Sequence, residues 1–344
     1  MQSKYHGYAD EAQANLIKNY WNEEKGTFYD KYPRITADIL NYWWIAHAID
    51  TLTDAYIRTG DAKYKKYADT ALETTIARNK GKIINDYYDD MQWMAIALLR
   101  LYDHTREAKY LSHIVTLWHD IKDGENEYMG GGIAWRKQQL YYKNTPANAP
   151  AAIFAARYYN AVKDPDDLVW AKILFAFVDN NLTDKQTGEV WDGINRQEDG
   201  KIDKAWCFTY CHGVYIGAAV ELYKITGEQA YLDKAIRTAG FALGRFIGEN
   251  GTFTETGEGD GGLFKGIFLR YLVELYKVIP DYTGIRDMLY SNVDILHKNG
   301  TSADGRIGRS WMHAPSESDG FDLIVQLSGT MLYEMAAVIE AMQE

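Results

Sequence analysis

The stretch YIRTGDAKY, residues 56–64, recurs in variant form along the chain and decides the fold. Each copy starts with a tyrosine and lies between two apolar patterns of period 3.6, which predicts a helical hairpin repeated along the sequence. The leading tyrosines are 46, 57, 64 and 53 residues apart. The copies are YIRTGDAKY (56–64), YDHTREAKY (102–110), YNAVKDPDDLVW (159–170), YKITGEQAY (223–231) and YKVIPDYTGI (276–285).

The periodicity predicts twelve helices and an all-α fold. A length of 344 residues would ordinarily suggest about two domains, but no linker or composition shift divides the chain. Six hairpins can instead close into an (α/α)6 toroid of six inner and six outer helices, which makes residues 1–344 a single domain. The predicted helices cover 8–22, 38–59, 61–79, 87–105, 107–122, 147–163, 165–181, 207–226, 228–247, 262–279, 282–298 and 319–342.

The composition excludes several classes of partner. The chain has 37 Lys and Arg against 48 Asp and Glu, a net charge of −11, and no basic run, which argues against nucleic acid. No stretch of 18 apolar residues is present, so we expect no membrane insertion. The N-terminal residues MQSKYHGYADEAQ lack the features of a signal peptide, which predicts a cytoplasmic protein, or a secreted one if a leader has been trimmed.

The connections between the predicted helices alternate in length. Short turns join helices at one end of the toroid, so the long loops share the opposite face, and each feeds an inner helix. Loops of this size in a compact domain are usually functional. The long loops contain GGIAWRKQQLYYKNTP (131–146), GEVWDGINRQEDGKIDKAW (188–206), ENGTFTETGEGDGG (249–262) and NGTSADGRIGRSWMHAPSESDG (299–320).

The adjacent pair Asp89 and Asp90 falls in the first turn of the predicted helix 87–105, at the long-loop face. Two such carboxyl groups can lie about 5–5.5 Å apart, as in retaining glycosidases, where one is the acid/base and the other the nucleophile. The helix N-terminus stabilises a carboxylate, whereas a neighbouring charge raises the pKa of the group that ionises last. We predict that this pair is catalytic.

A structural reading of the same residues remains open. Asp86 could be the N-cap and Asp89 the third helical residue of a capping box, since acidic residues are common in a first helical turn. The chain holds a comparison pair, Asp166 and Asp167, at the start of a predicted outer helix. That pair follows a short turn and has no loop aromatics around it, so we expect it on the outside.

Aromatic residues near the long loops are candidates for stacking on sugar rings. The alternative for those on helices is packing in the interior. His212 is expected as a polar wall of the pocket. The candidate substrate-binding residues are Trp43, Trp44, Trp93, Trp135, Trp191, Tyr210, His212, Phe253 and Trp311, and Trp206 stands in the same group of loop aromatics.

The sequence predicts neither a metal nor a cofactor. Cys207, Cys211 and His212 do not match a zinc spacing, and Glu255, Glu258 and Asp260 do not match a calcium loop. No glycine-rich nucleotide motif and no GxSxG serine-hydrolase motif occurs.

Five segments together resemble glycoside hydrolase family 76, the endo-α-1,6-mannanases. The resemblance implies an (α/α)6 fold and cleavage of α-mannosidic linkages with retention. It also implies that Asp89 is the nucleophile and Asp90 the acid/base. The segments are YYDDMQWMAIALLRLYD (87–103), NTPANAPAAIFAARYY (144–159), FTYCHGVYIGAAVELYKITG (208–227), FKGIFLRYL (264–272) and NYWWIAHAIDTLTDAYIRTGD (41–61).

The segment at 209–213 departs from the family, which commonly has Thr-Tyr-Asn-Gln-Gly where this chain has Thr-Tyr-Cys-His-Gly. This difference bears on the substrate more than on the reaction. The leading hypothesis is a retaining glycosidase that acts on an oligo- or polysaccharide of α-1,6-linked mannose. The alternatives are another (α/α)6 enzyme, such as an unsaturated-uronide hydrolase or a sugar epimerase, and a non-catalytic glycan-binding protein.

Overall fold

The computed structural model describes residues 3–35, 40–255, 257, 259–316 and 320–343. It divides the chain into two compact units. Unit 1 combines residues 1–80 with 244–344, and unit 2 is the continuous segment 81–243. The chain therefore starts unit 1, builds unit 2 and then returns to complete unit 1.

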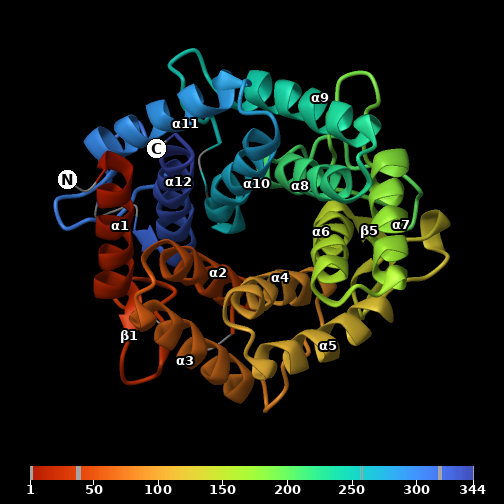
Figure 1. Ribbon diagram of the computed structural model, residues 1–344, viewed down its shortest axis with the longest axis horizontal. Coiled ribbons are helices and arrows are strands. Elements are labelled where there is room, and N and C mark those ends of the chain that lie inside the picture. The colour runs from red at the N-terminus through yellow and green to blue at the C-terminus, as the bar shows by residue number, and fades with distance from the viewer. Residues whose placement is uncertain (1–2, 36–39, 256, 258, 317–319, 344) are drawn as a thin grey trace. The chain divides into compact units, whose positions relative to one another are not determined.

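All twelve predicted helices are present in the described part of the chain (Figure 1). Their ends differ from the predicted ends by four residues or fewer. They are α1 (Lys4–Tyr20), α2 (Tyr42–Thr59), α3 (Ala62–Arg78), α4 (Tyr88–Thr105), α5 (Ala108–Lys122), α6 (Thr145–Val162), α7 (Pro165–Asn181), α8 (Thr209–Thr226), α9 (Gln229–Phe246), α10 (Phe264–Val278), α11 (Thr283–Ile295) and α12 (Leu323–Ala341).

The recurring turns share one backbone device. At four of the five, the residue four positions after the leading tyrosine has a positive φ of 59° to 70°, and its N–H donates to the tyrosine carbonyl oxygen, which closes the helix end. The fifth turn differs because Pro280 stands at this position and has no N–H. The four donor–acceptor pairs are Gly60 to Tyr56 (2.8 Å), Arg106 to Tyr102 (2.7 Å), Lys163 to Tyr159 (2.7 Å) and Gly227 to Tyr223 (2.9 Å).

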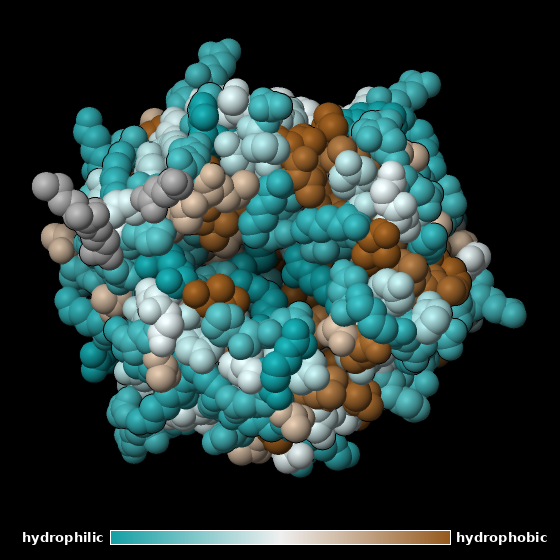
Figure 2. Space-filling model, in the orientation of Figure 1, coloured by the Kyte–Doolittle hydropathy of each residue, from teal (hydrophilic) through white to brown (hydrophobic). Residues whose placement is uncertain are grey.

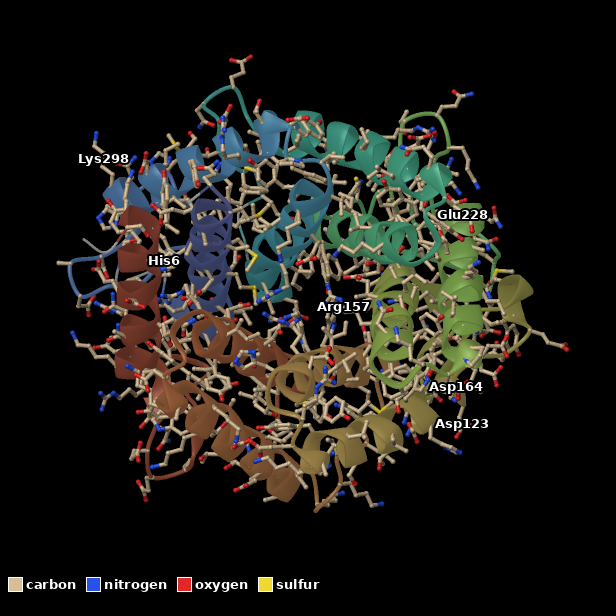
Figure 3. The ribbon with its side chains drawn as sticks, viewed as in Figure 1. His6, Asp123, Arg157, Asp164, Glu228 and Lys298 are labelled. Carbon is tan, nitrogen blue, oxygen red and sulfur yellow. The ribbon has the colours of Figure 1, made fainter. Side chains whose placement is uncertain are left out.

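Helices α4, α6 and α8 form the interior of unit 2. α6 packs against both α4 and α8, α5 packs on α4, and α7 packs on α6 (Figure 1). Most residues of the three interior helices are buried, whereas α5 buries only one stripe. Arg157 of α6, labelled in Figure 3, is paired with Glu221 of α8 at 2.7 Å. Within unit 2, the predicted alternation of inner and outer helices is confirmed.

Short strands lie in segments that the sequence analysis predicted to be loops. In unit 2, β4 (Ala134–Arg136), β5 (Gln139–Asn144) and β6 (Gly193–Ile194) form a three-stranded antiparallel sheet. The sheet joins the loop before α6 to the loop before α8. An isolated bridge between Tyr87 and Arg136 ties it to the start of α4. The long loops of unit 2 therefore converge at the N-termini of its interior helices.

Unit 1 is closed by packing of α12 against α1, α2 and α10. Its described strands form two antiparallel pairs, β1 (Trp21–Asn22) with β2 (Thr27–Phe28) and β3 (Lys31–Tyr32) with β7 (Phe321–Asp322). Among the described residues, α12 alone is long and apolar enough to cross a membrane, but 89% of its most apolar window is buried. It has the character of a core helix.

The surface in view carries mostly hydrophilic residues, with apolar ones in small groups (Figure 2). Three exposed apolar residues, Val115 on α5 and Val169 and Ile173 on α7, lie on the outer helices of unit 2. The two short turns that precede α7 and α9 carry Asp164 and Glu228, labelled in Figure 3. This acidic and hydrophilic exterior agrees with the net charge of −11.

Candidate active site

Asp89 and Asp90 occupy the first turn of α4. The N-cap of this helix is Tyr87, and no side chain caps it. The alternative interpretation, with Asp86 as the N-cap of a capping box, is therefore wrong. Neither carboxylate belongs to the N-cap residue, and both lie at the positive end of the helix dipole, which favours their charged form.

Both carboxylate oxygens of Asp89 accept hydrogen bonds. The backbone N–H of Asp90 donates to Oδ1 at 3.0 Å, and the indole Nε1 of Trp135 donates to Oδ2 at 3.1 Å. Trp135 belongs to β4, which the bridge from Tyr87 to Arg136 holds beside the start of α4. The sheet therefore fixes the position and orientation of the Asp89 carboxylate.

The pKa of Asp89 is raised from its ordinary value of 3.8 to about 7. The main cause is burial, which removes water from the charged form, and the negative charge of Asp192 adds to it. The two hydrogen bonds to the carboxylate act in the opposite direction and lower the pKa. A carboxyl group that titrates near neutral pH is a mark of a functional site.

Asp90 is held by a different partner. The side-chain amide of Asn85 donates from Nδ2 to Oδ2 of Asp90 at 2.9 Å. The other end of the amide, Oδ1 of Asn85, accepts the backbone N–H groups of Asp86 and Tyr87. Asn85 is thus locked in the chain just before α4 and orients the Asp90 side chain. The sequence analysis did not identify Asn85.

A third carboxylate, Asp192, lies in the same region and was also missed. It is buried, and Tyr142 and Tyr210 donate their hydroxyl groups to it at 2.8 Å and 3.0 Å. The thiol of Cys211 is 3.7 Å from its Oδ1. Burial is the main cause of a raised pKa for Asp192. In the sequence, Asp192 is one of several acidic residues in a long loop, and spacing gave no reason to select it.

Two predicted binding residues of unit 2 line this site. Trp135 binds Asp89, and its ring also contacts Tyr142 edge-on at 5.9 Å. Tyr210 binds Asp192. These contacts connect Asp89, Trp135, Tyr142 and Asp192 in one continuous cluster. The site therefore combines three carboxyl groups with aromatic walls and indole and hydroxyl donors, a set suited to holding and cleaving a sugar chain.

Three other predicted binding residues of unit 2 are buried, and for Trp93 and Trp191 a role in binding stays a prediction. Trp93 is buried on α4, and Trp191 is buried beneath the ammonium group of Lys204. His212 is fully buried, with Nδ1 2.8 Å from the Phe208 carbonyl oxygen and Nε2 accepting the Val190 N–H at 3.1 Å. Both ring nitrogens are occupied, so the prediction that His212 is a polar wall of the pocket is wrong.

The remaining predicted binding residues belong to unit 1. Trp44 donates from Nε1 to Asp260 at 3.2 Å, and Trp43 contacts His47 edge-on. Trp311 is buried, with Phe253 against its edge and the Lys265 ammonium group 4.6 Å from its ring centroid. Their role in binding stays a prediction.

The residues weighed as metal ligands do not form a metal site where they are described. Among the described residues, no three His, Cys, Asp or Glu side chains are grouped to hold an ion. Asp260 instead binds Trp44, and Glu258 lies outside the described residues.

The comparison pair on α7 has a structural role. Asp166 follows the N-cap residue Asp164, whose side chain accepts the Asp166 backbone N–H. Asp167 is buried between α5 and α7 and accepts a hydrogen bond of 2.7 Å from Trp118 Nε1. Asp167 therefore links α5 and α7, and it is not on the exposed outside as predicted.

The sequence matches the model of glycosyl hydrolase family 76 over residues 5–343. Its structure is similar to that of an α-1,6-mannanase from Salegentibacter sp. HEL1_6, with a TM-score of 0.92 and 38% identity over 98% of this chain and 100% of the other. A variant of that mannanase, with two consecutive aspartates replaced by alanine, is described as inactive and in complex with α-1,6-mannotetrose.

Two further similar proteins extend this comparison. A protein from Listeria innocua has a TM-score of 0.93 and 39% identity over 99% of both chains. A mannan endo-1,6-alpha-mannosidase from Candida glabrata is 24% identical over 200 residues, which are 54% of this chain and 44% of that protein. The alignment thus spans less than half of this curated relative. The matches over nearly the whole chain confirm the predicted all-α, (α/α)6 fold class.

Proposed function

The chain belongs to glycosyl hydrolase family 76, and on that premise we propose that it hydrolyses α-1,6-linked mannose chains with retention of anomeric configuration. The observation that carries the proposal is the adjacent pair Asp89 and Asp90 at the start of α4, each carboxylate held by its own donor. A similar protein is described as inactive when two consecutive aspartates are replaced. Its described ligand, an α-1,6-mannooligosaccharide, supports the substrate class.

In the proposed reaction, Asp89 attacks the anomeric carbon and Asp90 protonates the departing glycosidic oxygen. The bond between the anomeric carbon and the glycosidic oxygen breaks, and a glycosyl ester forms on Asp89. Water then attacks the same carbon while Asp90 takes its proton, which releases Asp89 and the sugar with its original configuration. Asp89 suits the first role because two donors hold its oxygens in one orientation.

The reactive form of the pair carries one proton. Asp89 must be ionised to attack, and Asp90 must be protonated to act as the acid. Burial raises the pKa of Asp89 to about 7, and without the donors from Trp135 and the Asp90 backbone, which favour its charged form, it would lie higher. Loss of either state, the ionised Asp89 or the protonated Asp90, would stop the proposed reaction.

The two roles can be separated with Asp90→Ala and Asp89→Ala on aryl α-mannosides and on α-1,6-mannooligosaccharides. Loss of the acid costs about 10²–10⁴ in rate on oligosaccharides. We expect a smaller loss with an activated aryl leaving group, and azide should trap the glycosyl enzyme. Asp89→Ala should gain little from the same leaving group, since its nucleophile is gone.

The product anomer of the wild-type enzyme, followed by NMR, tests the mechanism itself. Retention is expected; inversion would rule out double displacement, because direct attack by water needs carboxyl groups about 6.5–9.5 Å apart. If the activated aryl leaving group restored activity to Asp89→Ala but not to Asp90→Ala, the two roles would be exchanged. Affinity for the oligosaccharide with no turnover would point to the alternative of a glycan-binding protein.

We expect full activity after extensive dialysis against EDTA. The proposed steps use only carboxyl groups and water, and the described residues offer no cluster of metal ligands. The measurement is kcat/KM before and after chelation, and again after addition of Ca²⁺, Mg²⁺, Mn²⁺ or Zn²⁺. A loss that one of these ions reverses would contradict the prediction.

A further inference from the structure

Trp206 lies in the loop before α8 and has an unusual exposure. All ten tryptophans of the chain are in the described residues, and Trp206 alone among them has more than a third of its surface exposed, at 44%. An exposed indole keeps a large apolar surface in water, which costs free energy that the fold does not recover. Trp206 thus has indole surface available for a ligand.

The backbone of Trp206 is bonded directly to the site. Its carbonyl oxygen accepts the N–H of Asp192 at 3.0 Å, and its own N–H donates to the Asp203 carbonyl oxygen at 2.9 Å. Asp192 is the buried carboxylate that binds Tyr142 and Tyr210 and whose charge acts on Asp89. Trp206 is therefore held one hydrogen bond away from the catalytic cluster.

The indole is also fixed in orientation. The guanidinium carbon of Arg196 lies 3.1 Å from the ring centroid, so Arg196 covers one face. Arg196 is in turn held by Asp203, which accepts hydrogen bonds from Nε at 3.0 Å and Nη2 at 2.8 Å. Because Arg196 covers one face, the exposed surface of Trp206, 44% of the residue, belongs to the rest of it, including the side of the ring away from Arg196.

Further aromatic rings continue from Trp206 toward the carboxylates. The centroids of Trp206 and Phe208 are 6.0 Å apart, and those of Phe208 and Tyr210 are 6.1 Å apart. Tyr210 reaches Asp192, and Arg196 Nη2 is itself 3.9 Å from Asp192. The open indole and the buried carboxylate thus share one arginine, which places the indole beside the cluster.

We infer that Trp206 is a sugar-binding subsite beside the cluster of Asp89 and Asp192, and that the side of its indole away from Arg196 stacks on a pyranose ring of the substrate chain. A pyranose presents an apolar face of C–H groups, which suits a rigid indole. The inference rests on the proposed function, because the ligand is a further mannose unit of the same α-1,6-linked chain. Trp206 thereby sets the chain length that the enzyme prefers.

The test compares the wild-type enzyme, Trp206→Ala and Trp206→Phe on an aryl α-mannoside and on α-1,6-mannobiose to mannohexaose. In the wild type, kcat/KM should rise at the chain length whose added unit reaches Trp206. Trp206→Ala should remove that rise, a loss of about tenfold for a single stacking contact. It should change kcat/KM on the aryl mannoside less than twofold, and Trp206→Phe should restore part of the rise.

A second measurement separates binding from turnover. In an Asp89→Asn, Asp90→Asn background, titration calorimetry with mannotetraose should show the same tenfold weakening for Trp206→Ala. Tyr128→Ala is the matched control, because Tyr128 is also an exposed aromatic of a unit 2 loop, at 53%, whereas the hydroxyl groups bonded to Asp192 are those of Tyr142 and Tyr210. We expect it to behave as wild type.

Two results would overturn the subsite. One is a kcat/KM for Trp206→Ala that is unchanged at every chain length, and the other is an equal loss on all substrates including the aryl mannoside. The second would show that Trp206 acts on Asp192 instead of on sugar. A wild-type enzyme that neither binds nor cleaves α-1,6-mannooligosaccharides would overturn the proposed function, and the subsite with it.

Discussion

Two tryptophan–aspartate hydrogen bonds at helix starts carry different roles in this protein. Trp135 donates to Asp89 in the first turn of α4 at 3.1 Å, and Trp118 donates to Asp167 in the first turn of α7 at 2.7 Å. Burial raises the pKa of both carboxyl groups. Of the two, only Asp89 belongs to the cluster with Asp192, so its ionisation, and not that of Asp167, should affect activity.

Replacement of Trp135 by Phe should move the pH dependence of activity. The indole N–H favours the charged form of Asp89, so its removal raises that pKa further above 7. Since Asp89 must be ionised to attack, the acidic limb of the kcat/KM profile should shift upward by about one pH unit, the equivalent of about 1.4 kcal/mol. The measurement is kcat/KM from pH 5 to 9 on an aryl α-mannoside.

Trp118→Phe is the matched control. It deletes the same kind of hydrogen bond between outer helices, so it should lower the melting temperature and leave the pH profile in place. If the acidic limb of the kcat/KM profile shifted equally in both variants, the profile would report loss of stability. If it did not shift in Trp135→Phe, Asp89 would not govern the acidic limb.

At the scale of single elements, the repeated turn shows what the sequence could predict. A tyrosine followed four residues later by a left-handed residue ends α2, α4, α6 and α8 in the same way, and periodicity located all twelve helices. The pairing of β6 with β5 was missed because it joins segments about 50 residues apart, which local patterns do not encode, whereas β4 and β5 form a local hairpin within a segment that was predicted to be a loop.

The candidate site was predictable only in part, for the same reason. Asp89 and Asp90 stand together in the sequence at a helix start, so local reasoning identified them. The roles of Asn85 and Asp192 depend on partners that the folded structure supplies. Asn85 binds Asp90, and Asp192 binds Tyr142 and Tyr210. His212 was misassigned because a buried histidine bonded to two backbone groups has the same sequence signature as one in a pocket.

His212 fixes α8 to the loop before β6. Nε2 accepts the Val190 N–H, so the proton lies on Nδ1 and is donated to the Phe208 carbonyl oxygen. His212→Ala should therefore lower the free energy of unfolding by about 3 kcal/mol through a cavity and two lost hydrogen bonds. At temperatures where the variant is folded, KM should change less than threefold.

Urea unfolding and steady-state kinetics check this pair of effects. His104→Ala is the control, since His104 is exposed near the end of α4 and should change stability by less than about 0.5 kcal/mol. A large rise in KM for His212→Ala with unchanged stability would support the original prediction that His212 lines the pocket.

At the scale of the whole molecule, α12 carries the contacts that complete unit 1. Glu334 is buried and accepts hydrogen bonds from Gln13 of α1 at 2.9 Å and from Arg58 of α2 at 2.8 and 3.0 Å. Six residues later, Glu340 accepts the backbone N–H groups of Tyr5 and His6 at the start of α1. One helix therefore fastens two others through two glutamates.

The two glutamates should differ in what they contribute to stability. Glu334→Ala leaves the Arg58 guanidinium buried with a lost partner, which costs about 3–5 kcal/mol. Glu340→Ala removes only a cap on α1 and should cost about 1 kcal/mol. Equal losses in urea unfolding of the two variants would contradict this difference.

The pairing of α1 with α12 also sets an order for folding during synthesis. Gln13 and Glu334 are 321 positions apart, so α1 and α2 leave the ribosome long before α12, which packs against both of them. Residues 81–243 form one continuous unit and meet all their unit 2 partners earlier. The nascent chain thus holds its first segment open while its middle folds, and a chaperone that binds exposed apolar helices would find its target in residues 4–78.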